Sequence, residues 1–211
     1  KVRGEFNRFR RPDFYFSGDV LLIWANCLLA DWQNEAIEIG TRCLKVPEQG
    51  GGIISDGHAF DTASFFLLEL HCLWQNIEFD RKAYSHPLFH DIPFIYNDIL
   101  KNWNTQDTDL VNDYINQMAD YHLTQTAEVK DPDEEYYEFD NTYNQLYPYE
   151  IMAWLKLRDH LGLPNPTEYS HALMNQPLAE FIEGTPLQKP KMEQVDTLLQ
   201  IIRDTYPDAK V

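Results

Sequence analysis

The amino-acid sequence predicts an all-α protein, in which stacked antiparallel helical hairpins form a single helical bundle. Apolar residues recur at helical spacing through most of its 211 residues. The best strand-like stretch, residues 52–55, is too short to build a sheet. Three predicted helix ends carry similar tryptophan-centred sequences, at 31–34, 73–76 and 102–105. Hairpins with a common turn would produce this similarity, although the unequal separations fit no strict repeat.

The first three helices are expected in the amino-terminal third of the chain. Ser17 is placed to cap a helix that reaches about residue 30 and is apolar on most sides, as is typical at the centre of a fold. A second helix is expected at about 32–44, ending before Pro47 and the glycines at 50–52. Asp56 is placed to cap the third helix, which continues through Phe60 to Trp74.

Four more helices are expected in the rest of the chain. The fourth and fifth are predicted at about 93–103 and 107–126. Pro148 occupies a first-turn position of the sixth helix, and Gly162 is placed to end it. A proline-rich stretch follows, and the last helix is predicted at about 192–205.

The chain length predicts one domain that can bury a substantial core. We assign residues 1–16 as a basic amino-terminal arm, 17–205 as a single helical domain and 206–211 as a tail. The first eleven residues carry five basic side chains and one acidic side chain. Two interpretations of the arm remain open, because it can fold back onto acidic surface or stay solvated.

Cysteine usage and hydropathy favour a cytoplasmic protein. Cys27, Cys43 and Cys72 lie in apolar helical contexts without a C-x-x-C pair, which indicates buried reduced thiols. Reduced thiols are typical of the cytoplasm. No apolar run approaches the ~18 residues of a membrane span, and no signal-peptide pattern opens the chain.

The most acidic stretch, residues 128–140, forms the predicted loop between the fifth and sixth main helices. From 104 to 150 the chain carries twelve Asp and Glu residues against Lys130, so −11 of its net charge of −17 lies there. Such a concentration repels itself unless a cation, a basic partner or solvent compensates it. The same charge argues against nucleic acid and membranes as partners, because both favour a cationic surface.

The predicted helix at 107–126 has two distinct faces. The face expected to be buried consists of Val111, Tyr114, Ile115, Met118 and His122. On the opposite side, Asp109, Asp113, Asn116 and Asp120 fall within about 60° of one another. Because tyrosine is enriched at protein interfaces, two loop tyrosines join the carboxylates as candidates. The candidate partner-binding residues are Asp109, Asp113, Asp120, Asp131, Asp133, Glu134, Glu135, Tyr136, Tyr137, Glu138 and Asp140.

A simpler interpretation of this surface stays open. Acidic faces often serve solubility alone, and the aromatic side chains near the loop can pack on the core. Phe139 and at least two of the tyrosines are expected to do so.

Neither a metal site nor a catalytic site is predicted. Residues 131–142 begin like a calcium-binding EF-hand loop, but Tyr136 stands where glycine is required and Thr142 where glutamate is required. His86 and His90 are separated by Pro87, which disfavours the shared helical face of a zinc pair. The chain has no G-x-S-x-G or P-loop motif. We therefore expect no enzymatic activity and no cofactor.

The segment from 147 to 164 carries a resemblance to a known family. It reads Tyr-Pro-Tyr-Glu-Ile-Met-Ala-Trp-Leu-Lys-Leu-Arg at 147–158 and Gly-Leu-Pro at 162–164, followed by His-Ala-Leu-Met at 171–174 and Pro-Leu at 177–178. Its expected buried seam consists of Ile151, Trp154, Leu155, Arg158 and Leu161. This segment resembles the carboxy-terminal part of all-helical bacterial immunity proteins from polymorphic-toxin and type VI secretion loci, including the PoNi-like group.

The resemblance implies that the protein binds a cognate toxin in the cytoplasm and blocks its active site or substrate path. Many such toxins act on nucleic acid or nucleotides through cationic clefts, which an acidic surface can fill. The alternative is a helical-repeat adaptor or scaffold that binds a partner protein in a groove between hairpins. A third class is an enzyme with a cryptic site. The sequence is compatible with both a monomer and a homodimer.

Overall fold

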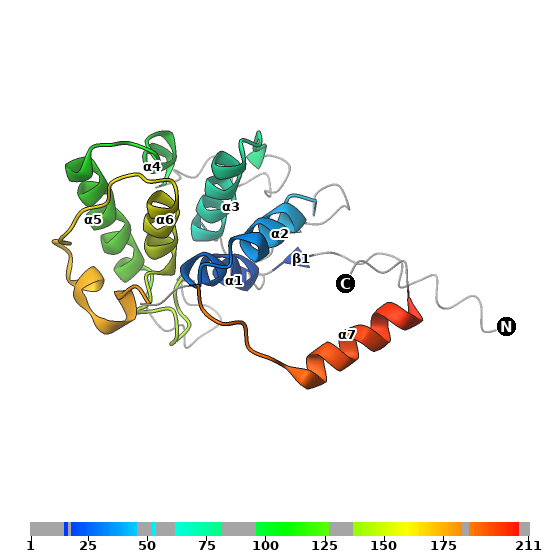
Figure 1. Cartoon of the computed structure of the whole chain (residues 1–211). Helices are drawn as coiled ribbons and strands as arrows, with labels where there is room; N and C mark the ends of the chain where they lie inside the picture. The colour runs from blue at the N-terminus through cyan, green and yellow to red at the C-terminus, as the bar shows by residue number, and fades with distance from the viewer. Residues whose placement is uncertain are drawn as a thin grey trace.

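The computed structural model describes residues 15–16, 18–45, 52–53, 62–81, 96–126, 137–182 and 186–206. The protein is helical, as the sequence predicts (Figure 1). Its α-helices are α1 (Gly18–Leu29), α2 (Gln33–Cys43), α3 (Thr62–Gln75), α4 (Asn97–Lys101), α5 (Thr108–Thr124), α6 (Tyr149–His160) and α7 (Glu193–Thr205). The short 3-10 helices η5 (Ala172–Asn175) and η6 (Pro177–Ala179) lie between α6 and α7. Strands β1 (Tyr15–Phe16) and β2 (Gly52–Ile53) form a two-residue parallel pair.

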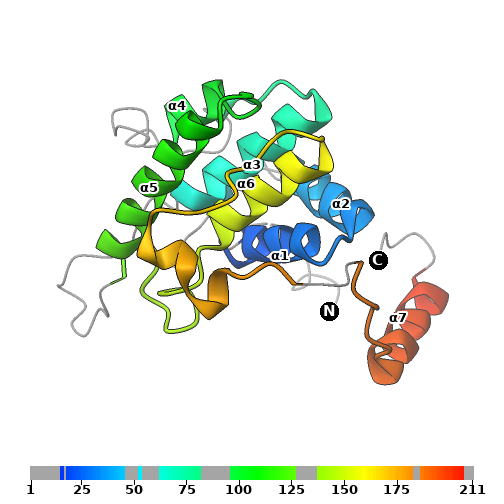
Figure 2. The same cartoon turned by 60° about the vertical axis from the view of Figure 1, so that its left-hand side comes forward.

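Helices α1 and α6 form the centre of the body. α1 packs against α2, α3 and α6, while α6 also contacts α3 and α5. Trp24 of α1 and Trp154 of α6 are the largest fully buried side chains of the described core. Helices α1 to α6 form one body, whereas α7 stands apart from it in both views (Figures 1 and 2).

α6 is buried around almost its whole circumference, although its sequence includes charged residues. Glu150 and Arg158 are as fully buried as the apolar side chains beside them. Four of the five predicted seam residues are buried, and the prediction is wrong only for Leu161. Leu161 follows the last helical residue and is 44% exposed.

Three helices end in the same backbone motif. Asp31 after α1, Asn76 after α3 and Gly162 after α6 have positive φ angles of 64°, 54° and 68°. At each of these ends the following amide donates to a carbonyl five residues back, at 2.8 to 2.9 Å. This Schellman geometry satisfies carbonyls that a helix end leaves unpaired. It does not account for the similarity of 31–34 and 73–76, because the positive-φ residue precedes the tryptophan in the first segment and follows it in the second.

Helix α2 crosses α3 at Gly40. A Cβ atom added at Gly40 would lie 2.5 Å from the ring of His71. The fully buried His71 ring sits edge-on to Trp24 and Trp74, with centroid distances of 6.1 and 6.2 Å. Burial lowers the pKa of His71 to about 4, so the ring is neutral at pH 7.

The three cysteines are buried free thiols, in agreement with the sequence. Burial raises the pKa of Cys43 and of Cys72 to about 12. Such thiols are poor nucleophiles, because the thiolate is the reactive form.

The predicted helix bounds agree closely with the structure where the chain is described. The helices expected at 32–44 and 192–205 occupy Gln33–Cys43 and Glu193–Thr205. The predicted caps Ser17 and Asp56 lie outside the described residues, as do 1–14 of the predicted arm and 207–211 of the tail. None of the described helices combines the length and apolar character needed to cross a bilayer.

Candidate functional site

Helix α5 carries the predicted acidic face, and its first turn is fixed by Asp107. The Oδ1 atom of Asp107 accepts hydrogen bonds from the backbone amides of Asp109 and Leu110, at 3.0 and 3.1 Å. This cap satisfies two amides that a helix start leaves without partners. The predicted apolar face is buried at Val111, Tyr114, Ile115, Met118 and His122. Burial of that face turns the carboxylates of the opposite face outward.

The carboxylate stripe on α5 divides into two parts. Asp109 and Asp113 are exposed, and nothing in the described parts of the chain forms an ion pair or hydrogen bond with their carboxylates. Asp120, by contrast, lies 3.3 Å from Nε2 of His171. One turn earlier, Asn116 accepts a hydrogen bond of 2.9 Å from the hydroxyl of Ser170. The second half of the stripe therefore contacts the segment just before η5, through His171 and Ser170. The first half faces solvent.

The end of the acidic loop is anchored to the body at Phe139. Its buried ring stacks on the ring of His122, with 3.9 Å between the centroids. Its amide donates a hydrogen bond of 2.7 Å to the carbonyl of Gln125, just after α5. The two ends of the loop are thereby held close together at the end of α5.

The aromatic residues after the loop mostly pack on the body, as the simpler interpretation predicts. Tyr149 is buried with Phe139, and Tyr147 is half-buried and donates a hydrogen bond of 2.6 Å to Asn26 of α1. Tyr143 remains 57% exposed. Tyr137 is half-buried, which leaves part of its ring accessible to a partner.

Glu138 has an internal role that the sequence did not reveal. Its Oε2 atom accepts hydrogen bonds from the hydroxyls of Thr62 and Tyr121, at 2.6 and 2.8 Å, and its Oε1 atom accepts one from the amide of Ala63. Thr62 and Ala63 begin α3, where the helix dipole stabilises a carboxylate. Partner binding by Glu138 stays a prediction, but three donors already engage its carboxylate.

A fully buried ion pair joins α5 to α6. Nδ1 of His122 lies 2.9 Å from Oε1 of Glu150, and Nε2 lies 3.0 Å from the carbonyl oxygen of Asn144. Since a carbonyl only accepts, Nε2 carries a proton, and the carboxylate favours a second proton on Nδ1. Burial alone lowers the pKa of His122, but the charge of Glu150 and the two hydrogen bonds outweigh it and raise the pKa.

These contacts reduce the charge available to a partner. Glu150 and Glu138 both belong to the twelve carboxylates counted between 104 and 150. Glu150 is compensated by His122, and Glu138 by the start of α3. Some of the carboxylates that the sequence suggests are on the surface therefore have partners inside the protein. A histidine and a glutamate on the apolar faces of predicted helices were the signals that could have revealed the pair.

Five of the predicted partner-binding residues lie outside the described residues, namely Asp131, Asp133, Glu134, Glu135 and Tyr136. Asp140, which follows them, is half-buried, and its carbonyl accepts a hydrogen bond of 3.2 Å from the side chain of Gln145. His86 and His90 also lie outside. Within the described ranges, no three His, Cys, Asp or Glu side chains gather in a way that could hold a metal ion.

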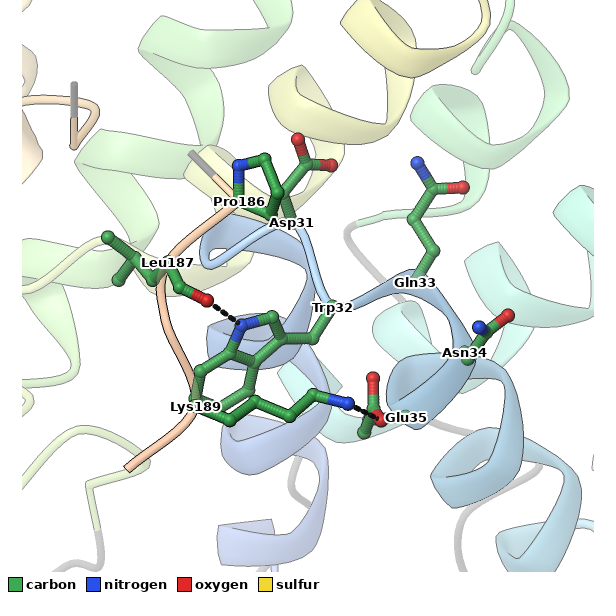
Figure 3. A pocket seen from close by; sticks show the side chains of 8 residues that line it. All are labelled: Asp31, Trp32, Gln33, Asn34, Glu35, Pro186, Leu187 and Lys189. Atoms are coloured by element: carbon green, nitrogen blue, oxygen red, sulfur yellow. Dashed lines mark hydrogen bonds and ion pairs between the residues drawn. The ribbon is translucent and has the colours of Figure 1, made fainter. Parts of the chain in front are cut away.

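A second concave region lies where the chain returns to the turn between α1 and α2 (Figure 3). This open hollow of about 410 Å³ is lined by Asp31, Trp32, Gln33, Asn34, Glu35, Pro186, Leu187 and Lys189. The indole of Trp32 donates a hydrogen bond of 2.7 Å to the carbonyl of Leu187, whose amide donates to Ala30 at 2.9 Å. Lys189 forms an ion pair with Glu35. Residues 186–189, which we call the strap, border the hollow. The two hydrogen bonds and the ion pair attach the strap to the body.

Comparison with known proteins gives no relative from which a function can be transferred. No family model matches the chain, and neither the curated proteins nor the solved structures include a match. The acidic surface is therefore the feature of the structure from which a function is inferred.

Proposed function

We propose that the protein is a cytoplasmic immunity protein that binds and neutralises a cognate cationic toxin acting on nucleic acid or nucleotides. The interface would be the acidic, tyrosine-bearing surface formed by the exposed carboxylates of α5 and the loop that follows this helix, and it would occlude the toxin's active site. This proposal includes no catalytic role for the chain and no cofactor.

The observation that carries the proposal is the exposure of Asp109 and Asp113 without a basic partner in the described chain. Both carboxylates project from a helix whose cap and buried face fix their orientation. Preorganised negative charge of this kind speeds association with a cationic surface and selects against acidic partners. Tyr137 lies two residues before Phe139, which is anchored at the opposite end of α5. It is half-buried and offers an aromatic anchor there, because interfaces draw much of their affinity from such rings.

A toxin-domain protein encoded next to this chain would be the partner in the test, which measures protection of growth and binding rates. We expect the Asp109→Lys/Asp113→Lys variant to lose protection and to associate at least tenfold more slowly at low salt. The difference should shrink at high salt, where exposed charges are screened. The matched control is Glu78→Lys/Asp159→Lys, which makes the same charge change at other exposed positions.

Equal protection by both double variants would remove the α5 surface from the interface. Tyr137→Ala and charge reversal at Glu134 and Glu135 extend the test into the loop. If all of these variants bind the toxin as the parent does, the acidic surface serves solubility alone.

The alternative is an adaptor of stacked antiparallel helical hairpins that binds a partner protein through an apolar surface. It is favoured by one observation, the exposed apolar face of α7. The same double variants separate the two functions, because an adaptor that uses α7 keeps its partner when Asp109 and Asp113 are reversed.

A further inference from the structure

Helix α7 is amphipathic, and its apolar face has no cover from the described residues. Met192, Val195, Leu198, Ile201 and Tyr206 are between 42% and 64% exposed, and no residue of α7 is buried. An isolated helix of 13 residues is marginal in water, because most helical stability in proteins comes from packing of the apolar face. The sequence of α7 therefore fits a helix that packs against another surface.

The strap described above fixes the chain to the body just before α7. The strap is tied to Ala30 and Trp32 by hydrogen bonds and to Glu35 by an ion pair. Only residues 190–192 separate Lys189 from the first residue of α7, and they include Pro190. Both overall views show α7 apart from helices α1 to α6 (Figures 1 and 2).

The apolar residues of α7 have the spacing of a two-helix seam. Met192, Val195, Leu199, Ile202 and Tyr206 follow one another at intervals of three, four, three and four residues, which is the a and d pattern of a coiled coil. Leu198 and Ile201 widen the apolar face on one flank. A seam of this kind packs well against a second helix whose apolar residues have the same spacing. The α7 helix of another copy of the chain is such a helix.

The charges beside the seam select the direction of the second helix. Asp196 and Arg203 lie on the same flank, seven residues apart and opposite in sign. In an antiparallel pair, a two-fold axis between positions 200 and 201 sets Leu199 against Ile202 and Val195 against Tyr206 of the other copy. The same axis places Asp196 of each copy near Arg203 of the other. In a parallel pair, Arg203 would instead face the apolar Leu198. The antiparallel pair also places the two bodies at opposite ends of a seam about 20 Å long.

We propose that two copies of the chain associate through α7, as an antiparallel pair of helices joined along this seam. The interface is small, below the ~1,200 Å² of a standard stable complex, so the dimer should form at micromolar concentrations. It does not depend on the proposed function.

Sedimentation of the full chain from low to several hundred micromolar tests the proposal. We expect a monomer–dimer equilibrium that Leu199→Glu shifts at least tenfold toward monomer. Gln200→Glu introduces the same charge on the polar face and should leave the equilibrium unchanged. Near-ultraviolet circular dichroism should be the same for both variants, since no residue of α7 is buried against the described body. A monomer at every concentration, or a dimer indifferent to Leu199→Glu, would overturn the proposal.

A charge exchange tests the direction of the pair. Asp196→Arg should weaken the dimer, and Asp196→Arg/Arg203→Asp should restore it. Absence of restoration would refute the antiparallel arrangement. Protection of the α7 amides from hydrogen exchange in a dilute monomer would show that another part of the same chain covers the seam, and it too would overturn the proposal.

Discussion

At the scale of single residues, Arg158 shows how a buried charge can be held with no counter-ion among the described residues. Its guanidinium donates to the carbonyls of Trp103, Thr105 and Pro164 at 2.6 to 2.8 Å, and to the side chain of Asn165 at 3.0 Å. These acceptors belong to the segment between α4 and α5 and to the segment after α6. One side chain therefore joins three parts of the chain, and its burial lowers its pKa.

Replacing Arg158, even with lysine, is expected to destabilise the protein strongly. An ammonium group has no planar fork of donors, so Arg158→Lys leaves buried carbonyls without partners and should cost about 3 kcal/mol of unfolding free energy. Urea unfolding followed by circular dichroism measures this loss. The control Arg42→Lys, at an exposed pair with Glu38, should change stability by less than about 0.5 kcal/mol. Equal small effects at both positions would show that the carbonyl contacts of Arg158 contribute little.

At the scale of elements, the crossing of α2 over α3 depends on the absence of a side chain at Gly40. Alanine normally stabilises a helix interior by about 1 kcal/mol relative to glycine. At Gly40 the added methyl group would meet the His71 ring at 2.5 Å, which no small adjustment relieves. The steric effect opposes the propensity effect, and at this distance it should dominate.

We expect Gly40→Ala to destabilise the protein by roughly 1 to 3 kcal/mol, as overpacking of a core does. In a His71→Ala background the ring is gone, so the same substitution should become neutral or stabilising. A double-mutant cycle from urea unfolding gives the coupling between the two positions directly. Additive effects would mean that α2 moves away from α3 without cost.

The elements were predictable from the sequence to different degrees. Apolar periodicity predicted the existence of the helices, and Pro148 and Gly162 predicted the two ends of α6 to within one residue, because caps and breakers act locally. The cap formed by Asp107 was not predicted. The burial of α6 around almost its whole circumference was only partly predictable. Arg158 was expected in the buried seam, whereas Glu150 looks like a solvent-facing position until its partner His122 on α5 is known.

The candidate site shows the same limit. The outward direction of Asp109 and Asp113 followed from helical spacing, and the structure places both on the exposed face. Glu138 looks equivalent to its acidic neighbours in the sequence, yet it caps α3, which begins 76 residues earlier. Local sequence patterns predict which way a side chain points. Contacts with residues distant in the sequence decide whether its charge is already compensated within the protein.

At the scale of the whole molecule, two buried histidines make stability depend on pH with opposite signs. The pKa of His71 is about 4 in the folded protein, against about 6.5 for an unfolded histidine. The unfolded chain therefore binds a proton first as the pH falls from 6.5 to 4. Stability decreases over this range by up to roughly 3 kcal/mol.

His122 acts in the other direction because Glu150 raises its pKa in the folded state. Its stabilising contribution is fully present below the unfolded pKa and is lost as the pH rises through the folded pKa. The contact that weakens is the one that joins α5, α6 and the end of the acidic loop. The loss of stability at high pH should therefore be accompanied by faster hydrogen exchange of the Phe139 amide.

Urea unfolding between pH 4 and pH 9 separates the two histidines. We expect His71→Leu to flatten the decrease of stability on the acidic side and to leave the alkaline side unchanged. We expect His122→Gln to flatten the alkaline side alone, because it removes the proton whose affinity Glu150 raises. The slope of unfolding free energy against pH is the decisive quantity, since it counts protons and is insensitive to packing losses common to all pH values. An alkaline slope that persists in His122→Gln would mean that the buried pair is not the group that titrates.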